Sequence, residues 1–151
     1  MEHAHAFVAA WAGWCPPSAA HGDLEPGVHG TLTTRVVPSA SLSTESEWKG
    51  TLAGTSRFTL ISLDEAHVPD AKISRFHGDL VLSTARGDLI GKDSGIWNLD
   101  TGNYFDVYTV TAGTGAFEGA TAVIFLWGTL DAATGEGLSQ YQGAVIGGQR
   151  R

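Results

Sequence analysis

Side chains with basic, cationic and acidic character alternate along one strand-like segment, residues 72–84. Arg75, His77 and Asp79 fall on the same face of an extended chain, because successive side chains of a strand point to opposite sides. If that face points into a confined cavity, desolvation and mutual interaction would shift the pKa values of these groups, as general acid–base catalysis requires. The pattern fits a solvated face equally well, so the sequence leaves both orientations open.

A second set of polar residues follows the same rule on the segment that begins at Tyr104. Tyr104, Asp106 and Tyr108 share one face, and Tyr141 on the last strand-like segment could approach them. The resulting hypothesis is a cavity that is mainly apolar and contains a few polar groups able to steer protons or charge.

These residues divide into catalytic and binding candidates. His77 or Asp106 is the expected proton-transfer group, and the Arg75 guanidinium is expected to stabilise negative charge that develops on the substrate. A tyrosine hydroxyl would orient the substrate. The candidate substrate-binding residues are all aromatic: Tyr108, Tyr141, Trp97 and Phe125.

Other common site motifs have the wrong spacing or are missing. The glycines of residues 113–119 are spaced G-x-G-x-x-x-G, one residue longer than the dinucleotide-binding fingerprint, and a strand-like run follows them. Residues 91–95 lack the G-x-S-x-G spacing of a serine nucleophile. His3 and His5 form only a weak chelating pair, and Cys15 has no second cysteine. We therefore expect no metal and no organic cofactor, and a tight connector at 113–119.

The segments that must position the candidate residues are short and rich in β-branched and aromatic residues, with glycine or Asp/Asn turns between them. Helical periodicity is not sustained over ten residues. The eight predicted strands are residues 28–37, 44–51, 55–63, 72–84, 88–98, 104–111, 120–130 and 137–146. The connection at 64–71, which contains Pro69, is predicted to be a longer loop.

Short connections make neighbouring strands antiparallel, and eight strands without covering helices have exposed edges unless the sheet closes. We therefore predict an all-β fold, an eight-stranded antiparallel closed barrel over residues 27–147. Its interior would hold side chains or one small ligand. An irregular N-terminal arm (1–26) and a short tail (148–151) flank the barrel in this interpretation.

The charge balance narrows the range of partners. Nine Lys and Arg residues stand against sixteen Asp and Glu residues, a net charge of −7, which gives no basic surface for nucleic acid or an anionic membrane. No run approaches the roughly 18 apolar residues of a membrane-spanning helix. The apolar run at 6–14 lacks the basic residues that precede it in a signal peptide, so we expect a cytoplasmic protein.

The segment 120–130 is apolar on both faces. Ile124 and Leu126 lie on one face, and Val123, Phe125 and Trp127 lie on the other. A solvated outer face would not carry this pattern. It fits a central strand of a sandwich, or a barrel strand whose outer face meets another subunit. We favour the second interpretation and expect a homo-oligomer.

Residues 104–121 read Y-F-D-V-Y-T-V-T-A-G-T-G-A-F-E-G-A-T, followed by an apolar strand, a glycine-containing turn and a last strand. This resembles the C-terminal half of the allene oxide cyclase-like and dirigent-like barrel superfamily, where a G-x-G-x-F-x-G-A element links two long antiparallel strands. Ala122 departs from the glycine usual there, and no catalytic residue is carried over from the family.

The resemblance implies an eight-stranded antiparallel barrel, commonly oligomeric and often trimeric, with a ligand site in its lumen and no organic cofactor in most members. Activities in the superfamily include epoxide cyclisation, guidance of radical coupling, cyclisation in natural-product pathways and oxidative demethylation of a phenazine. The expected function is an isomerase or cyclase that templates a hydrophobic natural-product-like substrate inside the barrel with acid–base assistance.

Two alternatives stay open: a non-catalytic barrel that carries a small hydrophobic ligand or confers self-resistance, and an enzyme that oxidises a heteroaromatic compound. A cavity above about 300 Å³ with convergent polar groups would favour catalysis or binding. A lumen filled by Trp48, Phe58, Trp97 and Phe125 would favour a structural role.

Overall fold

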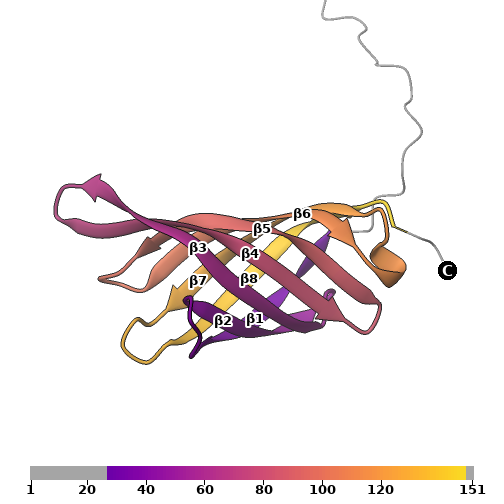
Figure 1. Cartoon of the computed structure of the whole chain (residues 1–151), viewed down its shortest axis with the longest axis horizontal. Coiled ribbons are helices and arrows are strands. Elements are labelled where there is room, and N and C mark those ends of the chain that lie inside the picture. The colour runs from indigo at the N-terminus through magenta and orange to yellow at the C-terminus, as the bar shows by residue number, and fades with distance from the viewer. Residues whose placement is uncertain (1–26, 149–151) are drawn as a thin grey trace, which may run out of the picture.

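The computed structural model describes residues 27–148, which form eight antiparallel strands closed into a barrel (Figure 1). The strands pair in chain order and β1 pairs with β8, so the predicted all-β class, strand number and closure are confirmed. The predicted arm at 1–26 and residues 149–151 of the tail lie outside the described residues. The strands are β1 (Val28–Val37), β2 (Ser43–Gly50), β3 (Gly54–Val68), β4 (Ala71–Thr84), β5 (Gly87–Asn98), β6 (Asn103–Gly113), β7 (Thr121–Leu130) and β8 (Glu136–Ile146).

The connection between β3 and β4 differs from the prediction. The two strands continue to Val68 and from Ala71, so the long loop expected at 64–71 is wrong. Pro69 and Asp70 form the turn, and Asp70 has the positive φ, 62°, that tight hairpin turns commonly need. Polar residues suggested a loop because this hairpin projects beyond the barrel (Figure 1) and both of its faces meet water.

The barrel has two ends with different contents. The β2–β3, β4–β5 and β6–β7 connections lie at one end, which we call the packed end, and the four other hairpin turns lie at the open end. The segment at 113–119 is the expected tight connector, and it contains a short 3₁₀ turn, η1 (Gly115–Phe117). Phe117 is buried under the packed end, and the Arg86 guanidinium lies 5.1 Å from its ring centre.

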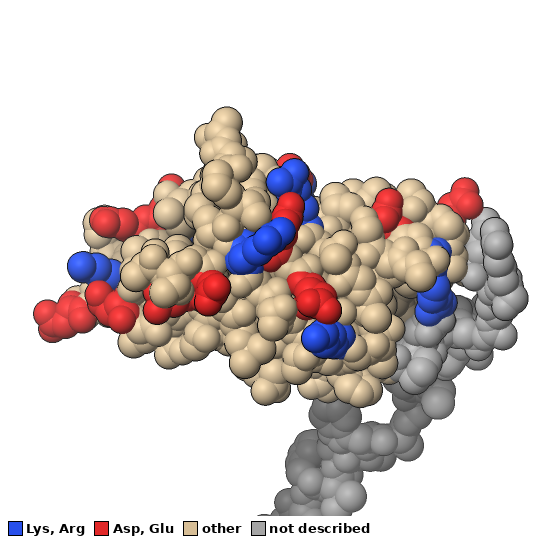
Figure 2. All heavy atoms as spheres, turned by 90° about the horizontal axis from the view of Figure 1, so that it is seen from below, with Lys and Arg blue, Asp and Glu red and all other residues tan. Residues whose placement is uncertain are grey.

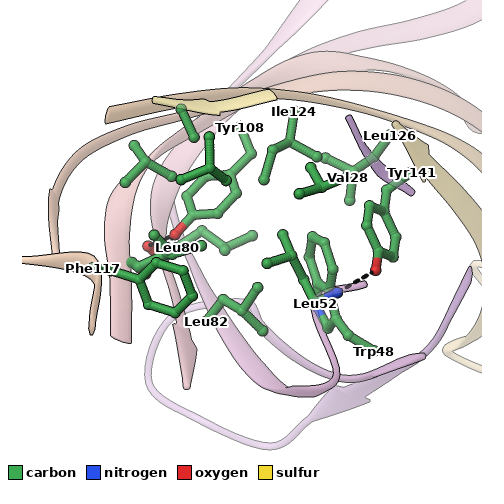
Figure 3. Close-up of a cluster of buried hydrophobic side chains, with 14 of the residues drawn as sticks. Val28, Trp48, Leu52, Leu80, Leu82, Tyr108, Phe117, Ile124, Leu126 and Tyr141 are labelled. Carbon is green, nitrogen blue, oxygen red and sulfur yellow. Dashed lines mark hydrogen bonds between the residues drawn. The ribbon is translucent and has the colours of Figure 1, made fainter. Parts of the chain in front are cut away.

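Large side chains fill the lumen at the packed end (Figure 3). Leu82, Leu89, Tyr108 and Ile124 have no exposed surface. Tyr141 packs at a tilt against Trp48 with 4.7 Å between ring centres, beside the β2–β3 turn. These contacts form the hydrophobic core on which the more open half of the barrel rests.

Two glycines make room for aromatic rings in this core. A Cβ at Gly30 would lie 2.7 Å from the Tyr141 ring, and a Cβ at Gly78 would lie 2.4 Å from the Phe58 ring. Both distances are shorter than van der Waals contact, so these positions need glycine for close packing. Part of the glycine excess in the sequence is explained by such contacts between strands and rings.

On the face shown in Figure 2, charged side chains stand among large uncharged areas. Glu45 lies between two arginines, 2.8 Å from Arg35 and 3.4 Å from Arg57, and all three side chains are substantially exposed. Within residues 27–148, no helix has the length and apolar character needed to cross a bilayer.

Candidate functional site

A pocket lies in the lumen on the open-end side of the packed core. Its cavity volume is about 80 Å³, below the roughly 300 Å³ at which ligand pockets usually begin. Leu42 and Leu63, which are 42% and 44% exposed, line its outer part, so the pocket reaches solvent between them. The aromatic side chains that line it are Trp48, Phe58, Phe76, Trp97 and Tyr104.

Two buried carboxyl groups face this mainly apolar pocket. Asp93 on β5 and Asp106 on β6 are each 4% exposed, and both line the cavity. In the strand register Asp106 pairs with Gly95, two residues from Asp93, so the carboxyl groups are diagonal neighbours on the inward face. The Oδ1 atom of each has no hydrogen-bond partner among the described residues. Burial of a carboxyl oxygen without a partner is costly, so a hydrogen-bond donor in the pocket would stabilise this pair.

The two carboxyl groups hold their protons more tightly than exposed ones. Burial raises the pKa of Asp93 to about 7, although a hydrogen bond from the backbone N–H of Ser94 acts in the opposite direction. Burial, followed by the negative charge of Asp93, raises the pKa of Asp106 well above its usual value. Near neutral pH the pair therefore retains at least one proton, and it can act as a proton donor or acceptor.

Tyr104 supplies a hydroxyl group beside the carboxyl pair. It lines the pocket, and its hydroxyl shares a hydrogen bond with the Ser139 hydroxyl. Burial and then the charge of Asp106 raise the pKa of Tyr104, so this phenol stays protonated at neutral pH. It can act as a hydrogen-bond donor, while proton transfer falls to the carboxyl groups.

The structure places the β6 candidates together, as alternation predicted, and it shows that their shared face is the inward one. Asp106 lines the pocket, whereas Tyr108 lies deeper, in the packed core. The Tyr108 hydroxyl donates to the Leu89 carbonyl oxygen at 2.5 Å and to that of Leu80 at 3.3 Å. Its hydrogen-bonding capacity is used by the barrel itself, so its geometry is structural.

Tyr141 and Trp97 are also held by hydrogen bonds within the barrel. The Tyr141 hydroxyl accepts a hydrogen bond from the Leu52 backbone N–H at 2.9 Å, and the residue does not line the pocket (Figure 3). Trp97 does line it, and its Nε1 donates to the Leu130 carbonyl oxygen at 3.2 Å. Trp97 can therefore contact a ligand with the face of its ring, while Tyr141 stabilises the barrel wall.

The predicted inward orientation of Arg75, His77 and Asp79 is wrong. Arg75 is exposed, His77 Nδ1 is hydrogen-bonded to Ser94 Oγ at 2.5 Å on the outer surface, and Asp79 forms an exposed ion pair with Lys92. Alternation shows which residues share a face, but it does not show which face is inside. The opposite face of β4 carries Phe76, Leu80 and Leu82, and its greater apolarity is the signal that could have decided the orientation.

Phe125 also lies outside the lumen. It is 43% exposed and stacks against Phe105 with 6.1 Å between ring centres on the outer surface. The predicted contact between Phe125 and a ligand in the lumen is therefore wrong. Because β7 is apolar on both faces, the sequence pattern could not assign its inner side.

Asp93 is the site residue that the sequence reasoning missed. It stands next to Lys92 in a strand with mixed polarity on both faces, so alternation gave no clear interior. The signal was in the register: Asp93 pairs directly with Tyr108, so an inward Tyr108 requires an inward Asp93. That pairing can be worked out only after the β5–β6 turn has been aligned.

The fold and site together define an all-β closed barrel whose apolar lumen pocket contains two buried carboxyl groups. Comparisons with protein-family models, with curated proteins and with solved structures found no match. Function must therefore be inferred from the chemistry of the pocket.

Proposed function

We propose that this protein is a small-molecule isomerase or cyclase that binds a compact, mainly apolar substrate in the lumen pocket. The observation that carries this proposal is the pair of buried, unpartnered carboxyl oxygens on Asp93 and Asp106. A purely structural barrel would be more stable with apolar side chains at both positions, because burial of an unsatisfied polar group costs about 1–3 kcal/mol.

The proposed chemistry divides the work between the two carboxyl groups. At neutral pH one carboxyl is protonated and can donate, while the other can accept a proton from a second position on the substrate. The walls of the pocket fix the substrate conformation, and the Tyr104 hydroxyl can hydrogen-bond to an oxygen or nitrogen of the substrate. Asp106 keeps its expected proton-transfer role, and Asp93 replaces His77 and Arg75.

The size of the cavity limits the substrate. A volume of about 80 Å³ does not enclose a natural-product-sized molecule, so such a substrate would extend through the mouth between Leu42 and Leu63. A place in the allene oxide cyclase-like superfamily is part of the same proposal. It is supported by the eight-stranded barrel with its lumen pocket, a shape that other barrel families share.

The test begins with native mass spectrometry of the protein purified from its own host, to recover any retained small molecule. That molecule is then incubated with the protein in D₂O. Proton transfer by the carboxyl pair would exchange C–H bonds of the retained molecule for C–D bonds or rearrange the molecule. Asp93→Asn and Asp106→Asn would each lower the rate of this reaction at least 100-fold. Asp79→Asn, an exposed aspartate on the outer face, is the matched control. Unchanged rates in both pocket variants would overturn the proposal.

A non-catalytic ligand-binding barrel is the second candidate, since the same apolar pocket and carboxyl pair could hold a ligand without chemistry; the cavity volume does not separate it from the isomerase. Under this candidate the retained molecule would be recovered unchanged, with no deuterium incorporated by the protein. Oxidation of a heteroaromatic compound, the third reading, also accommodates carboxyl groups in the lumen. It would differ from the isomerase in requiring an added electron acceptor.

We further propose that the chain forms a homo-oligomer through the outer face of β5–β7. Ile96, Phe105 and Trp127 lie side by side in the strand register and are 50%, 44% and 37% exposed. Contiguous exposed apolar surface of this kind commonly marks an interface. Sedimentation analysis is expected to give a dimer or trimer, and Phe105→Lys is expected to shift it toward monomer. We take a dissociation constant of roughly 100 µM as the weakest useful affinity for such an oligomer. A wild-type protein that is still monomeric at that concentration would contradict the proposal.

A further inference from the structure

Among residues 27–148, the charged side chains that line the lumen pocket are both carboxyl groups, Asp93 and Asp106, and no lysine, arginine or histidine of this range lines it. From this one-sided charge, we infer that the pocket takes a ligand with a positively charged nitrogen, such as a primary ammonium, attached to a compact apolar body. This inference rests on the proposed use of the pocket as a substrate site, and it names the substrate class.

The hydrogen-bonding capacity of the pocket matches an ammonium group. Asp93 and Asp106 both line the pocket, and the Oδ1 atom of each is buried without a partner among the described residues. A primary ammonium has three N–H donors and can donate one to each carboxyl group, whereas an alcohol has a single O–H donor. The charge-assisted bonds would also be stronger than those of a neutral donor. A carboxylate or phosphate ligand would instead be repelled by ionised aspartate.

The rest of the pocket suits a cation with an apolar body. Aromatic rings line the cavity around the carboxyl groups, and their faces attract positive charge as well as hydrocarbon. The small cavity favours a short chain or a single ring inside, with anything larger leaving through the mouth. The aromatic residues that line the cavity are Trp48, Phe58, Phe76, Trp97 and Tyr104.

The surface around the mouth has the same sign of charge. The open-end turns and the strand ends beside them carry six carboxylates and three cationic side chains. Lys72 lies 4.0 Å from Asp100, and Arg35 and Arg75 stand opposite Glu136 and Asp64 in the strand register. A negative rim raises the local concentration of cations and would steer them toward the lumen. The six carboxylates are Asp64, Glu65, Asp70, Asp100, Asp131 and Glu136.

Ionisation of the pair should govern binding. The titratable groups that face the two carboxyls are the phenols of Tyr104 and Tyr108 on β6, while the inward residues of β4 and β7 beside them are apolar. Since burial raises the pKa of Asp93 to about 7, a cation should bind more tightly at pH 8 than at pH 5.5. A neutral ligand of the same shape should show little change or the opposite one.

The experiment compares isosteric probes by NMR titration of the full chain. The probes are benzylamine, benzyl alcohol and benzoate, with n-butylamine, n-butanol and butyrate as smaller counterparts. At pH 8 we expect an amine to bind at least 10-fold more tightly than its alcohol, and the carboxylates not to bind. The preference should shrink at least 3-fold at pH 5.5. The double variant Asp93→Asn/Asp106→Asn should lose the amine preference and keep the alcohol affinity, and Asp79→Asn should match wild type.

Equal or tighter alcohol binding, carboxylate binding, or no amine binding in either series would overturn the inference. The D₂O incubation separates this failure from failure of the proposed function. Amines that bind without any proton exchange would leave the inference standing and remove the catalytic proposal. A neutral molecule that binds in preference and exchanges protons would do the reverse.

Discussion

The two ends of the barrel are built from the same eight strands, yet they satisfy their polar groups in opposite ways. At the packed end the Tyr108 hydroxyl donates to the Leu89 carbonyl oxygen, so its burial is compensated. One strand away, Asp93 pairs with Tyr108 in the register but receives no hydrogen bond from it, and its Oδ1 stays unpartnered among the described residues. Burial of the Tyr108 hydroxyl is compensated within the packed core, whereas burial of the carboxyl groups beside the pocket costs stability. We therefore expect stability to be concentrated at the packed end.

The wall between the two regions is formed by aromatic residues. The Tyr141 hydroxyl fixes the Leu52 backbone, and its ring packs on Trp48, which is 2% exposed and also lines the pocket. The Trp48 indole N–H in turn donates to the Ser56 hydroxyl at 2.8 Å. Because these hydrogen bonds and ring contacts make the wall rigid, it would hold a ligand against the carboxyl pair with little loss of side-chain freedom on binding.

Side-chain truncation is expected to give the largest difference between the two ends in the free energy of unfolding that is lost. Leu82→Ala removes a fully buried side chain at the packed end, and the cavity it leaves should cost about 2–5 kcal/mol of unfolding free energy. Leu63→Ala at the mouth, where 44% of the residue is already exposed, should cost less than about 1 kcal/mol. Urea denaturation measures both. Similar losses in the two variants would remove the distinction between a packed and an open end.

The carboxyl pair should make the protein less stable as pH rises. The folded-state pKa of Asp93, about 7, lies above its unfolded value near 3.8. Between these values the folded state binds more protons, so the free energy of unfolding falls from pH 4 to pH 7. Asp93→Asn should therefore stabilise the protein at pH 8 by on the order of a few kcal/mol and have little effect at pH 4. Asp79→Asn is the control, and equal effects at both pH values would contradict the assignment.

Removal of one hydroxyl group tests the wall between the ends. Tyr141→Phe keeps the ring against Trp48 but leaves the buried Leu52 N–H without its acceptor, which should cost about 1–3 kcal/mol. Thermal and urea denaturation check the stability, while NMR titration with benzylamine checks the pocket. We expect the affinity to change less than 3-fold. A large loss of affinity without loss of stability would make Tyr141 a ligand contact, as the sequence interpretation had it.

The smallest effects are expected on the outer face of β4. His77→Ala and Arg75→Ala should each change the free energy of unfolding by no more than about 0.5 kcal/mol, because both side chains lie on the outer face. Neither should alter amine binding or proton exchange. A loss of turnover in either variant, with the fold intact by circular dichroism, would place chemistry on the outer face and contradict the lumen site.

The sequence by itself determined the fold class, the strand number and which residues share a face. These follow from local rules: β-branched segments of the right length, glycine-rich turns and the two-residue period of a strand. The same rules found that Tyr104, Asp106 and Tyr108 stand together. They missed the β3–β4 hairpin, since a two-stranded ribbon that projects into water needs no apolar face.

Only the tertiary structure decided which face of each strand is inside and which residues meet across it. The local sequence of a strand does not decide which of its two faces is buried. Closure of the barrel decides this, because the strand must pack against the other seven. That selection turned His77 and Phe125 outward and brought Asp93 to the pocket beside Asp106. The candidate site is therefore a property of strand register and closure, which act between residues far apart in the chain.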